Sequence, residues 1–165
     1  IVAEAGKATG HLFRLATTLW SVPVSTGYGR RMRFLVIDKT NEKLIGILAL
    51  GDPVFNLKIR DEWVGWTGDQ RARNLVNVLD AYVVGSVPPY SQILGGKLVA
   101  SLIGSREISQ YFRAKYRGST GVISGARKNP VSGLCRSTYR EERSFKGNSL
   151  ALPIGLERPS STQWK

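Results

Sequence analysis

Residues 60–100 read RDEWVGWTGDQRARNLVNVLDAYVVGSVPPYSQILGGKLVA, and this stretch decides the expected fold. It contains a capping box, in which the Thr67 hydroxyl accepts from the amide of Gln70 and the Gln70 side chain reaches back to Thr67. A helix is therefore predicted to begin after Thr67. Residues 81–87 then predict a buried strand, which Pro88-Pro89 ends. Ser91 is expected to cap a further helix.

The flanking segments predict two more helices and a hairpin. Residues 10–20 have helical periodicity, and the expected buried face carries Leu12, Leu15, Ala16 and Leu19. Residues 32–38 and 44–50 predict strands joined by a polar turn at 39–43, and 54–59 is expected to extend the second strand irregularly. The helix after Thr67 is expected to bury Ala72, Leu75, Val76 and Leu79. The helix capped by Ser91 is expected to bury Leu94, Leu98 and Leu102. A helix over 106–117 is expected to bury Ile108, Tyr111 and Phe112.

The order of these elements predicts an α/β (α+β) fold with a mixed, largely antiparallel sheet flanked by helices. Residues 122–123 and 134–138 are candidates for further strands. The order is similar to that of the GNAT acyltransferase fold. We expect one domain over residues 1–154 and a poorly structured tail over 155–165. Because the chain begins at Ile1 and not at a methionine, a fragment of a longer polypeptide is expected.

The charge of the chain favours a polyanionic partner. Twenty-four Lys and Arg against twelve Asp and Glu give +12 and a pI near 10.3. From residue 106 onward there are twelve basic and four acidic residues, so this part holds +8 of the +12. Lys and Arg neutralise phosphates and release condensed counterions, which drives binding to nucleic acid. The alternative is that the charge serves solubility alone.

The cysteine and histidine content narrows the chemistry. Cys135 is the only cysteine, so the chain forms no internal disulfide, and a reducing cytoplasm is expected. One Cys and one His do not supply a typical four-ligand zinc site. We expect no cofactor. We also expect no membrane partner, since no apolar run is long enough to span a bilayer.

Two basic groups are candidate nucleic-acid contacts. The first, Arg71, Arg73 and Asn74, is expected near a helix start, where unpaired amides attract anions. Its alternative is a solvated face in which Asp69 pairs with Arg73. The second group lies along a helix and the loop after it, and we expect phosphate contacts from Arg113, Lys115, Arg117, Arg127 and Lys128.

The similarity to the GNAT fold raises the possibility of an acyltransferase, and the turn over residues 92–97 bears on it. GNAT enzymes hold a pyrophosphate on backbone amides at a corresponding glycine-rich turn, but here Lys97 stands where a small residue is required. Lys97 is therefore a further candidate for pairing with phosphate. The alternative is that Gly95 and Gly96 permit close packing of a helix on the sheet.

The aromatic residues Trp63, Trp66 and Tyr90 have two interpretations. Beside arginines they are suited to stacking on nucleic-acid bases. Large aromatic residues that flank a helix more often fill a core, and we favour that interpretation for both tryptophans. No carboxylate pair or Ser-His-Asp arrangement has convincing spacing, so a metal-dependent nuclease stays a lesser alternative.

The Trp-x-x-Trp pair, the Arg-x-x-Asn-Leu stretch over 71–75 and the Gly-Gly-Lys helix start together resemble the DruA-like family, most densely over residues 33–116. That family is named for a protein of the Druantia anti-phage defence system. The resemblance implies bacterial genome defence or mobile elements and larger partner proteins, but no agreed reaction. The leading hypothesis is a DNA-binding accessory protein of anti-phage defence. The alternatives are an acyl-CoA N-acyltransferase, and a metal-dependent nuclease or mobile-element-associated DNA-processing protein. Self-assembly stays open.

Overall fold

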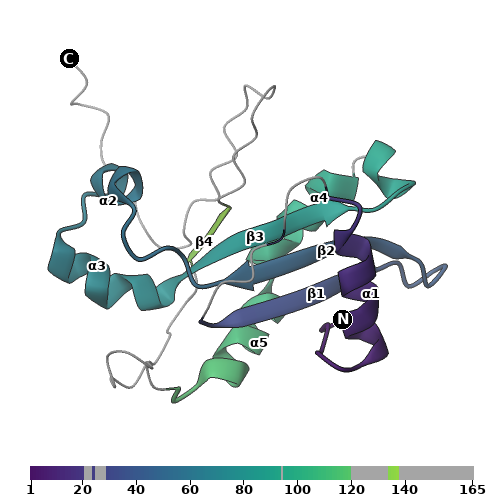
Figure 1. The fold of residues 1–165 in the computed structure, drawn as a ribbon, viewed down its shortest axis with the longest axis horizontal. Coiled ribbons are helices and arrows are strands. Elements are labelled where there is room, and N and C mark those ends of the chain that lie inside the picture. The colour runs from purple at the N-terminus through teal and green to yellow at the C-terminus, as the bar shows by residue number, and fades with distance from the viewer. Residues whose placement is uncertain (21–23, 25–28, 94, 120–133, 138–165) are drawn as a thin grey trace.

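A computed structural model describes residues 1–20, 24, 29–93, 95–119 and 134–137. The elements in chain order are α1 (Ala8–Thr17), β1 (Arg31–Ile37), β2 (Leu44–Gly51), α2 (Lys58–Val64), α3 (Gly68–Asn74), η1 (Leu75–Asn77), β3 (Val78–Ser86), η2 (Tyr90–Gln92), α4 (Gly95–Ser101), η3 (Leu102–Gly104), α5 (Arg106–Tyr116) and β4 (Leu134–Ser137). Figure 1 shows α1 and α5 on opposite faces of one sheet, with α2 and α3 beyond its end.

The sheet has the strand order β1-β2-β3-β4. β1 pairs antiparallel with β2, and β2 pairs antiparallel with β3. β4 runs parallel to β3, because the chain returns to the same edge through α4 and α5. The predicted mixed, largely antiparallel sheet is therefore confirmed. The strand candidate at 122–123 and the expected tail over 155–165 lie outside the described residues.

The turn between β1 and β2 has the expected length and is closed by its own polar side chains. Asp38 Oδ1 accepts from the Thr40 amide at 2.8 Å, and Asn41 Oδ1 accepts from the Lys43 amide at 3.0 Å. Asn41 Nδ2 also donates to the Tyr90 hydroxyl at 2.8 Å. This bond ties the turn to η2.

The core lies on both faces of the sheet because β2 is buried on both. On one face Leu48 and Leu50 pack in a cluster with Val99 of α4 and Phe112 of α5. On the other face the buried cluster consists of Ile47 and Ala49 of β2, Phe13 and Ala16 of α1, and Ala3, Leu35, Val83 and Val87. Three layers result, with the sheet between α1 and the α4–α5 pair.

The predicted buried face of α1 is partly wrong. Ala16 is buried as expected, but Leu12, Leu15 and Leu19 are exposed, Leu15 by 67%. Phe13 is buried in their place. A phenyl ring covers more apolar area than a leucine, so the helix turns Phe13 toward the sheet and carries the leucines outward.

Three expectations about the middle of the chain also need correction. Residues 54–59 do not extend β2, because α2, which the sequence pattern does not predict, begins at Lys58. α3 ends at Asn74 and β3 begins at Val78, earlier than expected, which leaves Ala72 exposed. Leu75 and Leu79 are buried as predicted, although Leu79 lies in β3 and not in the predicted helix.

α4 packs closely on the sheet through Val99, which is fully buried, whereas Leu98 is 47% exposed, contrary to the predicted stripe. Gly46 of β2 makes this approach possible. A Cβ there would lie 2.4 Å from the Gly85 carbonyl oxygen and 2.6 Å from Val99 Cγ2. The burial of Ile108 and Phe112 in α5 agrees with the prediction.

Among the helices in the described residues, none combines the length and hydropathy that a membrane crossing requires.

Replacing Gly46 by Ala should destabilise the fold, because the added methyl group meets backbone on one side and Val99 on the other. Such overpacking costs about 1–3 kcal/mol. Thermal unfolding followed by circular dichroism measures the change. Gly104→Ala is the matched control, since nothing lies within 4 Å of its added Cβ. Equal melting temperatures for the two variants would contradict the close approach of α4 to β2.

Candidate nucleic-acid interface

A cationic pocket of about 280 Å³ lies between residues 2–5, β1 and α5. Its lining combines three cationic residues, one carboxylate and one aromatic ring with small apolar groups: Arg31, Arg33, Lys115, Glu4, Tyr111, Val2, Ala3 and Ala5. We call it the β1-edge pocket. The excess of cations makes it suited to an anionic ligand.

The last turn of α5 is fixed to β1 at Arg31. The Tyr116 hydroxyl accepts from the Arg31 amide at 2.8 Å and donates to the Arg31 carbonyl oxygen at 2.9 Å. Lys115 Nζ donates to the same carbonyl oxygen at 2.9 Å. Burial raises the pKa of the Tyr116 hydroxyl, although its backbone bond to Arg31 acts against this, so the group stays a neutral donor. These bonds hold the Lys115 ammonium at the pocket.

Aromatic rings position the two arginines of the pocket. The Arg33 guanidinium lies 5.8 Å from the centroid of Phe13, and that of Arg31 lies 4.3 Å from the centroid of Tyr82. Contacts of this kind orient a cation without neutralising its charge. Both guanidinium groups are therefore held against aromatic rings at the sheet.

The carboxylate in the pocket is already paired. Glu4 Oε2 lies 2.5 Å from Lys7 Nζ, and the hydrogen bond and charge of Glu4 raise the pKa of Lys7. The neighbouring Arg30 is also paired, since its Nε donates to Asp52 Oδ1 at 2.6 Å and its guanidinium lies over the Phe112 ring. Arg30 therefore supports the core.

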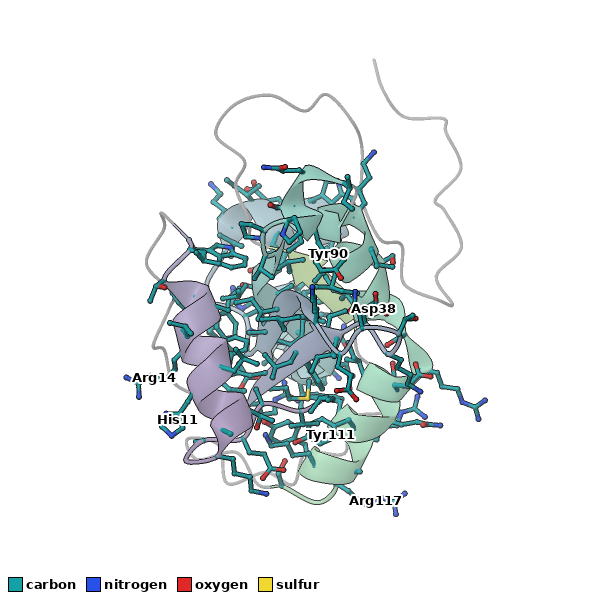
Figure 2. The ribbon with its side chains drawn as sticks, turned by 90° about the vertical axis from the view of Figure 1, so that its right-hand side faces the viewer. His11, Arg14, Asp38, Tyr90, Tyr111 and Arg117 are labelled. Carbon is teal, nitrogen blue, oxygen red and sulfur yellow. The ribbon has the colours of Figure 1, made fainter. Side chains whose placement is uncertain are left out.

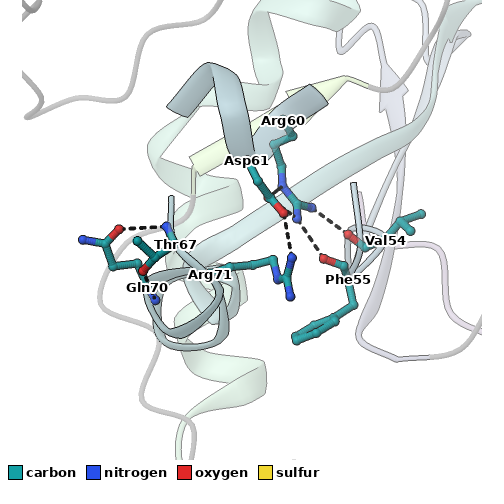
Figure 3. Close-up of polar contacts among 7 residues, drawn as sticks. All are labelled: Val54, Phe55, Arg60, Asp61, Thr67, Gln70 and Arg71. Atoms are coloured by element: carbon teal, nitrogen blue, oxygen red, sulfur yellow. Dashed lines mark hydrogen bonds and ion pairs between the residues drawn. The ribbon is translucent and has the colours of Figure 1, made fainter. Parts of the chain in front are cut away.

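A second charged cluster organises the α2–α3 arm, the segment 54–74 between β2 and β3. The buried Arg60 donates to the Val54 carbonyl oxygen at 2.6 Å and to that of Phe55 at 2.9 Å. Its Nε donates to Asp61 Oδ1 at 2.9 Å, and Arg71 NH1 donates to Asp61 Oδ2 at 2.9 Å (Figure 3). One buried carboxylate thus joins α2 to α3.

The ionised state of Asp61 depends on its two arginines. Burial alone would raise the pKa of this carboxyl group, but the hydrogen bonds and charges of Arg71 and Arg60 outweigh it. The net result is a pKa below the ordinary value of 3.8. The cluster therefore contains a stable carboxylate between two guanidinium groups.

The first predicted contact group does not lie at a helix start. Thr67 and Gln70 form the predicted capping box, but α3 has only seven residues, so Arg71 and Arg73 fall in its last turn. Arg71 pairs with Asp61 of α2.

The other members of this group lie on the surface of α3. Arg73 and Asn74 are exposed. Arg73 Nε donates to the backbone oxygen of Asp69 at 3.4 Å, so the pairing with the Asp69 carboxylate that the alternative interpretation required is not formed.

The second predicted group is divided between described and undescribed parts of the chain. Arg113, Lys115 and Arg117 are exposed at the end of α5, and only Lys115 lines the β1-edge pocket. Figure 2 shows Tyr111 between α5 and α1 and Arg117 projecting from the end of α5. Arg127 and Lys128 lie outside the described residues.

Lys97 is exposed in the first turn of α4 and is not among the residues that line the β1-edge pocket. A Cβ on Gly95 would lie 2.4 Å from the Tyr90 carbonyl oxygen. Gly95 is therefore required for close packing, whereas Gly96 has only the Ser86 hydroxyl within 4 Å of an added Cβ. The packing interpretation of the glycine pair holds for Gly95.

Sequence reasoning misses the pocket roles of Arg31 and Arg33. Both belong to a short basic cluster at the boundary between an expected loop and an expected strand. The usable signal is their spacing of two residues, which places both side chains on one face of β1. Neither pattern nor spacing indicates that α5 brings Lys115 to the same place.

The predictions for the aromatic residues have different outcomes. Trp63 is 68% exposed, so the core interpretation is wrong for this residue. Trp66 is half-buried and lines a pocket in the arm. Within the described part of the chain, no group of three or more His, Cys, Asp or Glu side chains could hold a metal ion.

Replacing Asp61 by Asn should lower the melting temperature at neutral pH, because two guanidinium groups lose their carboxylate. The pKa of Asp61 is lowered in the folded state, so its contribution is complete above the ordinary value of 3.8 and is lost as the pH falls through the folded pKa. The difference between the two proteins should therefore narrow below pH 3.8. Melting curves measured from neutral to acidic pH provide the test.

Glu62→Gln is the matched control on the same helix, since the Glu62 side chain is 65% exposed in its pair with Lys58. Exposed pairs contribute little to stability, so this variant should melt like the original protein. A pH-independent difference for Asp61→Asn would show that the carboxylate charge is not what holds the arm.

Comparison with known proteins gives a family. A family model described as Druantia protein DruA matches residues 2–149. The chain is 53% identical over 149 residues to Druantia protein DruA of Escherichia coli (strain UMEA 4076-1). The aligned residues cover 90% of this chain and 37% of that protein. The chain thus spans little more than a third of the curated relative that it matches. No solved structure matches it. The family match over most of the chain shows that the protein belongs to the DruA family.

Proposed function

We propose that this domain binds nucleic acid, with DNA favoured, as a DNA-binding accessory component of bacterial anti-phage defence. The observation that carries the proposal is the β1-edge pocket, which Arg31, Arg33 and Lys115 line and in which the carboxylate of Glu4 is paired with Lys7. Cationic side chains of this kind bind phosphate and fix a protein on a nucleic acid without reading its sequence.

The surface beyond the pocket supports the same proposal. Arg113 and Arg117 are exposed one turn apart near Lys115, so the basic surface continues along the end of α5. The net charge of +12 provides the longer-range attraction that steers a polyanion toward such a surface.

The defence context is part of the proposal. The relative is named as a protein of the Druantia system, and this chain covers only 37% of it. We therefore expect the domain to act in the bacterial cytoplasm with further parts of a longer polypeptide and with other defence proteins, and self-assembly is compatible with this arrangement.

We also propose that the domain has a GNAT-like scaffold. It is supported by the antiparallel β1-β2-β3 order followed by a parallel strand after two helices. Lys97 and the packing of Gly95 do not favour an acyl-CoA site at the corresponding turn. No particular observation in the described residues favours acyl transfer or cleavage as a second function.

Binding to duplex DNA should weaken steeply with salt. If about five phosphates are bound, the logarithm of the affinity falls against the logarithm of salt concentration with a slope of about −4.5. Replacing Arg33 and Lys115 together by Gln should reduce the magnitude of the slope by about 1 for each phosphate that the variant no longer binds. Fluorescence anisotropy over a salt series measures both quantities.

The matched control replaces Lys39 and Lys43 by Gln, since both are exposed in the turn between β1 and β2. This variant removes the same charge away from the pocket. If both double variants weaken binding equally, charge alone governs binding and the pocket is not a site. Salt-independent binding, or no binding at low salt by a folded sample, would refute phosphate-dominated recognition.

A further inference from the structure

α2 carries charged residues inward and apolar residues outward. Arg60 and Asp61 are buried, whereas Ile59 and Trp63, one turn apart, are exposed. A surface helix ordinarily has the opposite arrangement. Burial in the core of this domain therefore does not account for Trp63, and its exposed indole is available to a ligand.

A pocket of about 450 Å³ opens beside the same helix. Its lining combines an aromatic ring, an amide, two cations and two carboxylates with two cap residues of α2: Trp66, Asn56, Lys58, Arg71, Asp61, Glu62, Leu57 and Gly65. Pockets for small ligands range from about 300 to 1,000 Å³. The arm pocket therefore has room for one nucleotide.

The aromatic and cationic groups around the arm are held in place before any ligand arrives. Arg60 fixes the backbone of Phe55 through its carbonyl oxygen, and the Arg71 guanidinium lies 4.8 Å from the centroid of the Phe55 ring. Arg71 is itself bonded to Asp61. Preorganisation of this kind lowers the entropic cost of binding.

We propose that the α2–α3 arm binds unpaired nucleotides, with one base stacked on Trp66 in the pocket and a neighbouring base on Trp63. Lys58 is suited to the phosphate, because its pair with Glu62 is exposed and weak at 3.5 Å. Asn56 supplies an amide for the polar edge of the base. The inference rests on the proposed function. The ligand class is single-stranded nucleic acid, and its site is separate from the β1-edge pocket.

The chemistry around the arm favours a nucleic acid over a protein partner. Ile59 and Val54 are exposed and would also suit an apolar protein surface. However, four cations against three carboxylates leave residues 54–74 with a net charge of +1, in a chain with a net charge of +12. Stacking accepts any base, since each has a π face, whereas bases in a duplex are already stacked on one another. Single strands are therefore the expected ligand.

The experiment compares a single-stranded thymidine oligonucleotide of about 10 nucleotides with a duplex of the same length. Trp63→Ala should weaken single-strand binding by about 5- to 150-fold and leave duplex binding unchanged. Trp63→Phe should restore most of the affinity. Leu15→Ala is the control, because Leu15 is an exposed apolar residue on α1 with a similar exposed fraction of 67%. It should change neither binding reaction.

A second measurement covers Trp66, whose removal affects packing because the ring is half-buried. Trp66→Phe keeps an aromatic ring in the pocket, so it should remain folded and should reduce the quenching of tryptophan fluorescence by the oligonucleotide. Trp63→Phe should reduce it as well.

The possible outcomes separate the two proposals. If duplex binding persists and neither Trp63→Ala nor Trp66→Phe alters single-strand binding or quenching, the stacking site is wrong and the proposed function stands. If the original protein binds neither strand type, the proposed function fails and the stacking site fails with it. If Trp63→Ala abolishes self-association in size-exclusion chromatography but leaves nucleic-acid binding unchanged, the patch docks protein and the inference is overturned.

Discussion

The fold depends on one constraint, the burial of β2 on both of its faces. From Gly46 to Gly51 every residue of this strand is buried. An antiparallel sheet often leaves one face to water, but a strand with apolar residues on both sides needs a cover on each. α1 supplies one cover, and α4 with α5 supplies the other. The crossover through α4 and α5 then sets β4 parallel to β3.

Two clusters of charged side chains, with buried arginines, connect segments around this three-layer core. Arg30 with Asp52 closes the start of β1 against α5, and Asp61 with two arginines joins α2 to α3. A buried carboxylate is costly unless cations and hydrogen bonds compensate it. Each cluster therefore holds together the backbone segments that carry its charged side chains.

The sequence predicts what depends on local chemistry. The capping box at Thr67 and Gln70 and the hairpin between β1 and β2 are predictable because their signals lie within a few residues. The burial of Ile108 and Phe112 follows from helical periodicity in the same way.

The failures share a physical cause in tertiary packing. Helical spacing predicts that one face is buried, but not which of two adjacent apolar faces, so it misses Phe13 and Val99 and favours Leu12, Leu15 and Leu98 instead. It misses α2 because the buried residues of that helix, Arg60 and Asp61, are charged. The β1-edge pocket joins residues more than eighty positions apart, and sequence spacing carries no information about such a contact.

The hydroxyl of Tyr116 has a consequence for the behaviour of the protein in concentrated solution. β1 is an outer strand, and an outer strand exposes backbone groups to which another chain can add by strand pairing. Here Tyr116 and Lys115 use both backbone groups of Arg31, and residues 1–3 occupy the carbonyl oxygen of Arg33 and both backbone groups of Leu35. The edge that would otherwise seed aggregation is therefore occupied by the protein's own side chains and backbone, and the cationic pocket is built on the same bonds.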